Sequence, residues 1–447
     1  MESATAAERP AGRAAAALPP ASRMPPAFQT LAILLRPVEF AERCRLRFGD
    51  TFRLHFLPAG EVVMVSDPES LKRLFAADRV NTIAPGRNLA LEPLLGPRSV
   101  LLLTGDEHLR RRKLMLPPFH GQRMRAYETA IERATRRELA RWPSGTAFAL
   151  HPRMQAITLD VILAAVFGVG EERREKLRGN LVEILAATRS PATIGITMRR
   201  LAWLPRFRHI RRLVARTDEL LQPEIAERRA DRELEAREDI LSMLVAARFE
   251  DGDSMDDAEL RDQLMTLLVA GHETTATALA WTFELLFRAP AEHDRARAAA
   301  RSGDDAYLDA VATEALRLRP VVPFTGRKLL QPTELDGYEL PGKTVVLASI
   351  WLAHTRELTF PQPYEFKPER FTAGGTPETY SWVPFGGGTR RCLGAAFAQL
   401  EMRVVLRTVL REAILNPASP REERIVRRNV TLAPAHGTPA ILRARGP

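Results

Sequence analysis

Apolar residues recur every three or four positions along most of the chain, which predicts a mainly helical protein. The clearest of these segments are 123–141, 150–167 and 171–189. Each has one apolar face and one polar face, as expected for helices that pack on a core. Another helix is expected to open at Asp67-Pro68-Glu69, because Asp is a favoured cap and Pro a favoured first residue.

Strict alternation replaces this pattern near the N-terminus. In residues 51–66, Phe52, Leu54 and Phe56 alternate with polar residues, and a Pro-Ala-Gly turn then leads into EVVMVS. Alternation around such a turn is typical of a β-hairpin. The other strand-like segments are 337–340 and 344–349. The predicted fold class is therefore mainly α (α+β), with a small β-rich N-terminal portion.

One long helical segment has an unusual polar centre. Ser254 with Asp257 predicts a capping-box start and Pro290 predicts the end, which leaves roughly 33 residues or about 50 Å. A helix of that length must cross the protein, yet its middle, 270–275, reads Ala-Gly-His-Glu-Thr-Thr. Burying such groups costs several kcal/mol unless each finds a partner. They either satisfy one another in a core or surround something that is not protein.

Two interpretations of this polar centre remain open on the helix alone. The zinc-peptidase pattern H-E-x-x-H fails, because the residue four positions after His272 is Ala276. The polar residues could form a satisfied core network. Alternatively, Glu273 and Thr274 form a carboxylate–hydroxyl pair that delivers protons to a reaction beside the helix.

Charge and cysteine content exclude several classes of protein. The 65 basic and 55 acidic residues give a net charge of +10, but the arginines are spread out, which argues against a nucleic-acid partner. Two cysteines make no disulfide framework. We expect that no 18-residue apolar stretch occurs in the chain. A cytoplasmic location is therefore expected. Residues 1–24 are expected to be a flexible Ala/Pro/Arg-rich tail, and residues 25–447 a single domain without repeats or linkers.

The second cysteine stands in a specific loop. Residues 385–394 follow the pattern F-x-x-G-x-R-x-C-x-G and lead directly into the helical sequence AAFAQLEMRVVL. A cysteine just before a helix N-terminus meets free backbone N–H groups, which favour the thiolate. Such a thiolate suits a transition metal, so Cys392 is the candidate ligand. Cys44 lies in a helical segment without this loop.

At this point the sequence resembles the cytochrome P450 family, from about Pro25 to the C-terminus. The loop around Cys392 matches the family's cysteine-ligand loop at every fixed position. The motifs that carry the rest of the resemblance are 270–275 for oxygen activation, with Glu where many members have Asp, 314–317 for E-x-x-R, and 368–371 for the loop that completes it. The resemblance implies the P450 fold, a large helical domain with a long central helix over the haem.

The resemblance also implies a b-type haem, with Cys392 as the thiolate ligand to iron. The residues that it assigns to the cofactor are His108, Arg112, Arg327, Phe385, Arg390 and Cys392. Those that it assigns to catalysis are Glu273 and Thr274. Glu314, Arg317 and Arg370 are expected to form a structural network. His272 is expected to point away from the iron, and Gly271 to permit close approach to the porphyrin.

The implied function is monooxygenation of an apolar small molecule by O2. Two electrons come from NAD(P)H through a ferredoxin or flavodoxin with its reductase, since the chain shows no flavin or iron–sulfur module. Ala270, Val322 and Phe324 suggest an apolar pocket that suits a fatty acid, terpenoid, steroid or polyketide. The other pocket segments are expected in 79–103 and 181–213. We expect a monomer. The alternatives to the monooxygenase function are a haem sensor without turnover and a peroxide-driven peroxygenase.

Residues 198–216 form the most basic stretch of the chain. Leu204, Phe207, Ile210 and Leu213 recur at helical spacing, and arginines fill the other face. This pattern is typical of a lid helix with a solvated basic side, but also of a weak peripheral contact with anionic lipid. Pro205 interrupts the pattern and predicts two short helices joined at a bend.

Overall fold

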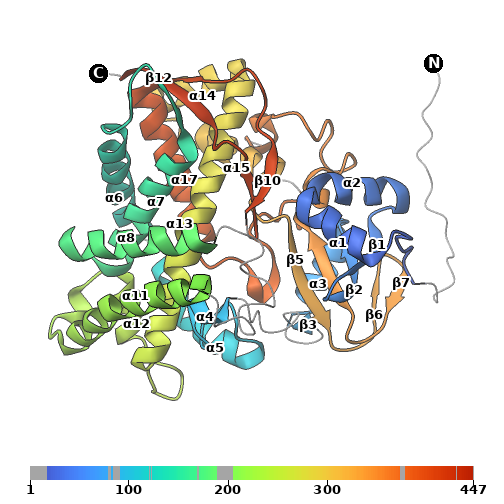
Figure 1. The fold of residues 1–447 in the computed structure, drawn as a ribbon, viewed down its shortest axis with the longest axis horizontal. Helices are drawn as coiled ribbons and strands as arrows, with labels where there is room; N and C mark the ends of the chain where they lie inside the picture. The colour runs from blue at the N-terminus through green and yellow to red at the C-terminus, as the bar shows by residue number, and fades with distance from the viewer. Residues whose placement is uncertain are drawn as a thin grey trace.

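The computed structural model describes most of the chain. The described residues are 18–78, 82–83, 91–119, 121, 123–168, 171–188, 205–372, 378–428 and 430–445. Most helices gather in one part of the molecule, and the largest sheet lies in the other with the N-terminal helices beside it (Figure 1).

Helices make up most of the described chain. They are α1 (Pro26–Leu35), α2 (Pro37–Phe48), α3 (Pro68–Ala76), α4 (Glu92–Leu95), α5 (Gly105–Met115), α6 (Arg123–Leu139), α7 (Leu150–Phe167), α8 (Glu171–Thr188), α11 (Pro205–Ala230), α12 (Ile240–Ala246), α13 (Asp257–Arg288), α14 (Pro290–Ser302), α15 (Asp305–Leu318), α16 (Ile350–His354) and α17 (Ala395–Glu412). Short 3₁₀ turns are η1 (Pro117–Phe119), η2 (Leu234–Ala236), η3 (Pro368–Phe371) and η4 (Gly388–Arg390).

Strands are short and form four small sheets. They are β1 (Thr51–Phe56), β2 (Gly60–Val65), β3 (Thr82–Ile83), β4 (Ala147–Ala149), β5 (Phe324–Leu329), β6 (Thr333–Leu335), β7 (Tyr338–Leu340), β8 (Val345–Ser349), β9 (Ala413–Pro417), β10 (Ile425–Arg428), β11 (Thr431–Pro434) and β12 (Pro439–Arg445). The largest sheet has the order β1-β2-β8-β5-β3, and the others are β4-β12-β9, β10-β11 and β6-β7.

Helix α13 crosses the helical part of the molecule and packs on α7 (Figure 1). Its cap differs from the expected one: Asp256, not Ser254, precedes the first turn, and its carboxylate accepts from Glu259 N at 2.8 Å. Asp256 and Glu259 have the capping-box spacing, which explains the shift of two residues. Pro290 is the first residue of α14, so it stops α13 as expected.

Helix α7 is an exception to the expectation that no 18-residue apolar stretch exists. Its 18 residues, Leu150–Phe167, are apolar enough to cross a membrane by length and composition. However, 72% of this segment is buried inside the fold, where Leu159, Leu163 and Val166 join the main core. It is a core helix that α13, α6 and α12 surround.

The five-stranded sheet joins distant parts of the chain. The predicted hairpin forms as β1 and β2, and β2 then pairs in parallel with β8, with Val62 opposite Val345. Antiparallel β5 and β3 complete the sheet, so strands from residues 324–349 extend the N-terminal β-rich portion. Leu71, Leu74 and Phe75 of α3 pack on this sheet.

Part of the predicted tail is packed. Arg53 N of β1 donates to Pro20 O at 2.8 Å, and Ser22 N donates to Arg53 O at 3.1 Å. The segment 18–24 therefore lines the edge of the sheet instead of being free. Residues 1–17 lie outside the described residues, and the single domain over 25–447 stays a prediction.

Candidate active site

The cysteine loop folds tightly ahead of α17. Cys392 N donates to Phe385 O at 2.9 Å, and Arg391 N donates to Gly388 O at 3.2 Å. Gly388 has φ +65°, and a Cβ there would lie 2.1 Å from Asp78 Oδ2. Glycine is required at this position by both its backbone conformation and the close approach of Asp78.

The Cys392 side chain lies in an enclosed but accessible place. It has exposed surface, although surrounding protein is dense enough for burial to raise the pKa of its thiol. A side chain that lines an internal space can have exposed surface and still be surrounded by dense protein. The Gly394 amide and the guanidinium groups of Arg112 and Arg391 partly offset this rise in pKa. A metal bound to this sulfur would itself favour the thiolate.

Two arginines near Cys392 have no acidic partner. Arg112 of α5 and Arg390 of η4 form no ion pair with any carboxylate in the described part of the chain. Burial lowers the pKa of Arg390 to about 10, with further lowering by Arg327 and Arg112. Two partly buried cations held close together favour an anionic ligand between them. Arg390 otherwise donates to the carbonyls of Val100 and Leu103.

His108 and Arg327, the other predicted cofactor cations, are engaged by protein. His108 Nδ1 lies 2.9 Å from Val100 O, and its Nε2 lies 3.2 Å from Thr389 O. Burial and then Arg390 lower the pKa of His108, and a neutral imidazole donates from one nitrogen only. His108 therefore connects the segment around Val100 to the cysteine loop, and its predicted contact with the cofactor stays a prediction.

Asp78, which no sequence motif indicated, organises Arg327 and the cysteine loop. Arg327 Nε donates to Asp78 Oδ1 at 2.7 Å, and both side chains are buried. The same carboxylate accepts from Thr389 N at 2.9 Å and from Thr82 Oγ1 at 2.8 Å. Because Asp78 pairs with Arg327, this arginine also supports the cysteine loop, and its predicted contact with the cofactor stays a prediction.

The centre of α13 opens on one side only. Ala270 is exposed and Thr274 is partly buried, whereas most residues on either side along the helix are buried. Residues four apart share a helix face, so Ala270 and Thr274 border the same space. The Thr274 hydroxyl donates to Ala270 O at 2.8 Å. Thr275, on the neighbouring face, contacts the buried Glu401 of α17.

Glu273 is held from the side of α7. Gln155 Nε2 donates to Glu273 Oε2, and His151 Nε2 lies 3.7 Å from Glu273 Oε1. Arg428 donates to His151 Nδ1 at 3.0 Å, which requires that this nitrogen carry no proton. The proton of neutral His151 is therefore on Nε2, directed at Thr277 Oγ1 at 3.1 Å and at Glu273.

Gly271 and His272 face the core. A Cβ on Gly271 would lie 3.2 Å from Ile162 Cδ1, so this glycine accommodates α7, and its expected approach to a porphyrin stays a prediction. His272 is buried, with Nδ1 2.9 Å from Leu268 O, and so points away from the accessible face. Burial lowers its pKa to about 4, so it is neutral.

The comparisons with known proteins agree with this site. The cytochrome P450 family model matches residues 19–435. The chain belongs to the cytochrome P450 family. A Mycobacterium tuberculosis relative provisionally named cytochrome P450 135B1 is 41% identical over 439 residues, 97% of this chain and 93% of its own. Another, provisionally named cytochrome P450 137, is 39% identical over 88% of this chain and 83% of its own.

Solved structures show the same fold. The retinoic-acid-bound cyanobacterial CYP120A1 superposes with a TM-score of 0.82 at 25% identity, covering 96% of this chain and 99% of its own. The cytochrome P450DA haem domain gives a TM-score of 0.83 at 22% identity, over 96% and 98%. Family membership supports a haem-dependent monooxygenase, and the P450 fold class is confirmed.

The residues present fit the thiolate-ligated haem of the P450 family. Cys392 would supply the sulfur ligand on an accessible side chain, and Arg112 and Arg390, which form no ion pair within the described residues, would supply cations for the two carboxylates of a haem. Phe385 is partly buried, packs edge-on against Trp382, and fixes Cys392 through its carbonyl.

The predicted structural network comes together in the core. Arg317 donates to both oxygens of Glu314, at 2.6 and 2.8 Å, and both side chains are completely buried. Arg370 Nε lies 3.4 Å from Glu314 Oε1, and Lys367 N donates to the same oxygen at 2.9 Å. The network anchors η3 to α15.

The candidate substrate residues are only partly assembled. Val322 and Phe324 are partly buried, and Phe324 packs against the core that β1 and α2 form, unlike the exposed Ala270. Much of the expected pocket lies outside the described residues, in 79–81, 84–90 and 189–204.

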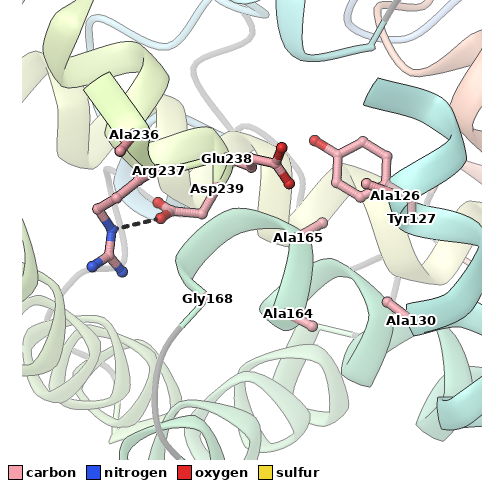
Figure 2. Close-up of a pocket in the computed structure, with 10 residues that line it drawn as sticks. All are labelled: Ala126, Tyr127, Ala130, Ala164, Ala165, Gly168, Ala236, Arg237, Glu238 and Asp239. Atoms are coloured by element: carbon pink, nitrogen blue, oxygen red, sulfur yellow. Dashed lines mark hydrogen bonds and ion pairs between the residues drawn. The ribbon is translucent and has the colours of Figure 1, made fainter. Parts of the chain in front are cut away.

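A separate pocket of about 460 Å³ opens between α6, the end of α7 and the start of α12 (Figure 2). Several alanines line this pocket, including Ala130 and Ala164. Arg237, another lining residue, pairs with Asp239 at 3.1 Å. Asp239 also caps α12. Because none of the predicted site residues lines this pocket, we assign it no part in the active site.

Proposed function

We propose that this P450 inserts one oxygen atom from O2 into an apolar small molecule, of fatty acid, terpenoid, steroid or polyketide type. Dioxygen activation and oxygen transfer are the chemistry that a thiolate-ligated haem supplies when bound. Cys392 holds the iron, while Arg112 and Arg390 bind the carboxylates. The observation that carries the proposal is the acid–alcohol pair on α13, with Thr274 on the accessible face and Glu273 held beside it.

In this proposal Glu273 and Thr274 deliver protons to the accessible face of α13. The Thr274 hydroxyl can turn from Ala270 O toward that face, because a hydroxyl both donates and accepts. Glu273, linked to Gln155 and His151, supplies the proton from the α7 side. A sensor without turnover or a peroxide-driven enzyme would not need this pair, which is why we favour the monooxygenase.

Electrons are proposed to come from NAD(P)H through a ferredoxin or flavodoxin with its reductase. Arg391 is exposed next to Cys392 and offers a cation for an acidic partner. Electrostatic steering of this kind weakens as salt concentration rises. A cytoplasmic location belongs to the same proposal, since both cysteines are free, as is usual in a reducing compartment.

A peripheral lipid contact of the basic stretch 198–216 remains a separate proposal. Residues 198–204 lie outside the described residues, and the rest belong to α11, one continuous helix from Pro205 to Ala230. There Ile210 and Leu213 are buried, and Arg208, Arg211 and Arg212 face outward. This arrangement favours the lid helix, because the apolar face is already used by the core.

Changing Thr274 to Ala tests the proposed function. We expect the variant to bind haem and substrate, but product formed per NAD(P)H to fall by about tenfold or more as electrons go to hydrogen peroxide. Product, peroxide and NAD(P)H consumption are measured together. Thr282→Ala is a matched control, since Thr282 also donates to the carbonyl four residues back, at 2.8 Å, but is buried. Undiminished coupling in Thr274→Ala would contradict the proposal.

A further inference from the structure

Exposed apolar side chains concentrate at the N-terminal helix. We define the α1 patch by its members, Met24, Phe28, Leu31, Leu34, Leu35 and Leu57. Phe28 is 62% exposed, Leu31 51% and Leu35 68%. Elsewhere in the described chain large apolar residues are exposed at scattered positions such as Leu330 and Leu358. A contiguous apolar surface of this kind marks an interaction site.

Helix α1 is inverted relative to an ordinary surface helix. Its Gln29 is buried and accepts from His55 N at 2.9 Å, and Thr30 Oγ1 accepts from Leu57 N at 2.8 Å. These polar side chains tie α1 to the β1–β2 hairpin and bring Leu57 beside it. A helix at a water-facing surface normally turns its apolar stripe inward. Here Gln29 and Thr30 share the inward face with the buried Ile33, and Phe28, Leu31 and Leu35 face out.

The charges around the α1 patch are positive. Arg23 and Arg36 bracket it and are exposed, and neither forms an ion pair with a described carboxylate. Helix α1 itself contains no Asp or Glu, and the nearest carboxylate in sequence is Glu39 on α2. An apolar face flanked by arginines suits the headgroup boundary of an anionic membrane.

We propose that the α1 patch is a peripheral binding surface for an anionic lipid bilayer. The 10 residues of α1 span about 15 Å, roughly half of the 30 Å hydrocarbon core, so the helix lies in the plane of the membrane interface. Leu57 on the adjoining hairpin turn extends the contact. This surface is separate from α11 and does not depend on the proposed function.

The test is co-sedimentation of the full-length holoprotein with vesicles of phosphatidylcholine, with or without one quarter phosphatidylglycerol. We expect binding to the anionic vesicles at low salt, and a drop of about tenfold or more in affinity for Leu31→Ser/Leu35→Ser. Leu330→Ser/Leu358→Ser removes two leucines of similar exposure elsewhere and should bind like the wild type. Arg23→Gln/Arg36→Gln should bind more weakly and lose the dependence on phosphatidylglycerol.

The changed residues are exposed, so folding is checked by an unchanged haem spectrum and melting temperature. Arg208→Gln/Arg211→Gln/Arg212→Gln distinguishes α11: a loss of binding in this variant alone would overturn the proposal. No binding of the wild type, or equal loss in the two leucine double variants, would also overturn it. So would sedimentation velocity that showed a dimer dissolved by Leu31→Ser/Leu35→Ser, because the partner would then be a second copy.

Discussion

At the scale of single residues, the position of one proton decides what His151 can do. Arg428 occupies Nδ1 as a donor, so the Nε2 proton of His151 is fixed toward Thr277 and Glu273. A buried neutral donor in this place orients a carboxylate without neutralising it. We infer that His151 is a positioning residue for Glu273, acting from α7.

Replacing His151 with Leu should therefore disturb proton delivery. Because Glu273 loses its polar neighbour on α7, whose Nε2 lies 3.7 Å from Glu273 Oε1, we expect product formed per NAD(P)H to fall by up to about tenfold, with KM for substrate unchanged. The solvent isotope effect on turnover should increase, which a purely structural role would not produce. His151→Gln retains an N–H donor and should recover part of the coupling. Coupling and isotope effect equal to the wild type would show that His151 is not involved.

The sequence could identify site residues that sit in a motif but not those that meet through packing. Cys392 and Arg390 belong to one loop, and Arg112 lies one helical turn from His108, so the motifs that carry the family resemblance include them. Asp78 contacts the cysteine loop across 311 positions, and no local pattern predicts such a contact. For the same reason the pairing of Arg327 with Asp78 was not predicted, and the role that the resemblance assigns to Arg327 at the cofactor stays a prediction.

Buried Glu401 is the other residue that the motifs did not reveal. Its carboxyl stands on an otherwise apolar face of α17, and burial raises its pKa well above the ordinary value. A carboxyl in an apolar helical pattern is a signal that sequence analysis can use. Its contact with Thr275 needs the packing of α17 on α13.

At the scale of elements, long helices were predictable and short strands were not. The bounds of α7 agree with the periodicity, because 18 residues provide five turns of pattern. Strands β9 to β12 were not expected, since segments of four to seven residues with interspersed Arg and Pro give no clear alternation. Their pairing is non-local: β12 pairs with β4, almost 300 residues earlier.

The buried pair of Glu314 and Arg317 makes a prediction at this scale. Glu314→Gln leaves Arg317 buried without a countercharge, so we expect the free energy of unfolding to fall by about 3–5 kcal/mol. Glu69→Gln breaks the exposed pairs that Glu69 forms with Lys72 and Arg73, and should cost less than about 1 kcal/mol. Urea unfolding of the holoprotein measures both. Similar losses in the two variants would show that α15 and η3 do not depend on this pair.

At the scale of the whole molecule, burial lowers the pKa values of His272 and His354 to about 4 and about 3, so both are neutral in the fold. His272 lies between α13 and α7. His354 joins the Arg317 network to the segment before the cysteine loop: Val383 N donates to its Nε2 at 2.8 Å. Burial, and then the charge of Arg317, lower the pKa of His354 to about 3. Protonation of His354 would break the bond from Val383.

These histidines predict how acid weakens the fold. Below pH 6.5 the unfolded chain binds a proton at each histidine that the folded protein does not, so the free energy of unfolding decreases as pH falls. Above pH 6.5 both states are neutral at these sites and the effect vanishes. Glu401 acts in the opposite sense, since its raised pKa keeps a proton on the folded state. The contribution of one histidine is therefore best measured as a difference between variants.

His354→Gln isolates that contribution. Glutamine can still accept from Val383 N but does not titrate, so between pH 7.5 and pH 5 the variant should lose about 2 kcal/mol less unfolding free energy than the wild type. Urea unfolding of the holoprotein at pH 7.5, 6 and 5 measures this difference. Any pH-independent loss of unfolding free energy caused by the substitution cancels in the comparison. His209→Gln on the exposed face of α11 is the control and should follow the wild-type pH dependence. If His354→Gln also followed it, His354 would be able to take up a proton in the folded protein, and the bond to Val383 would not hold it neutral.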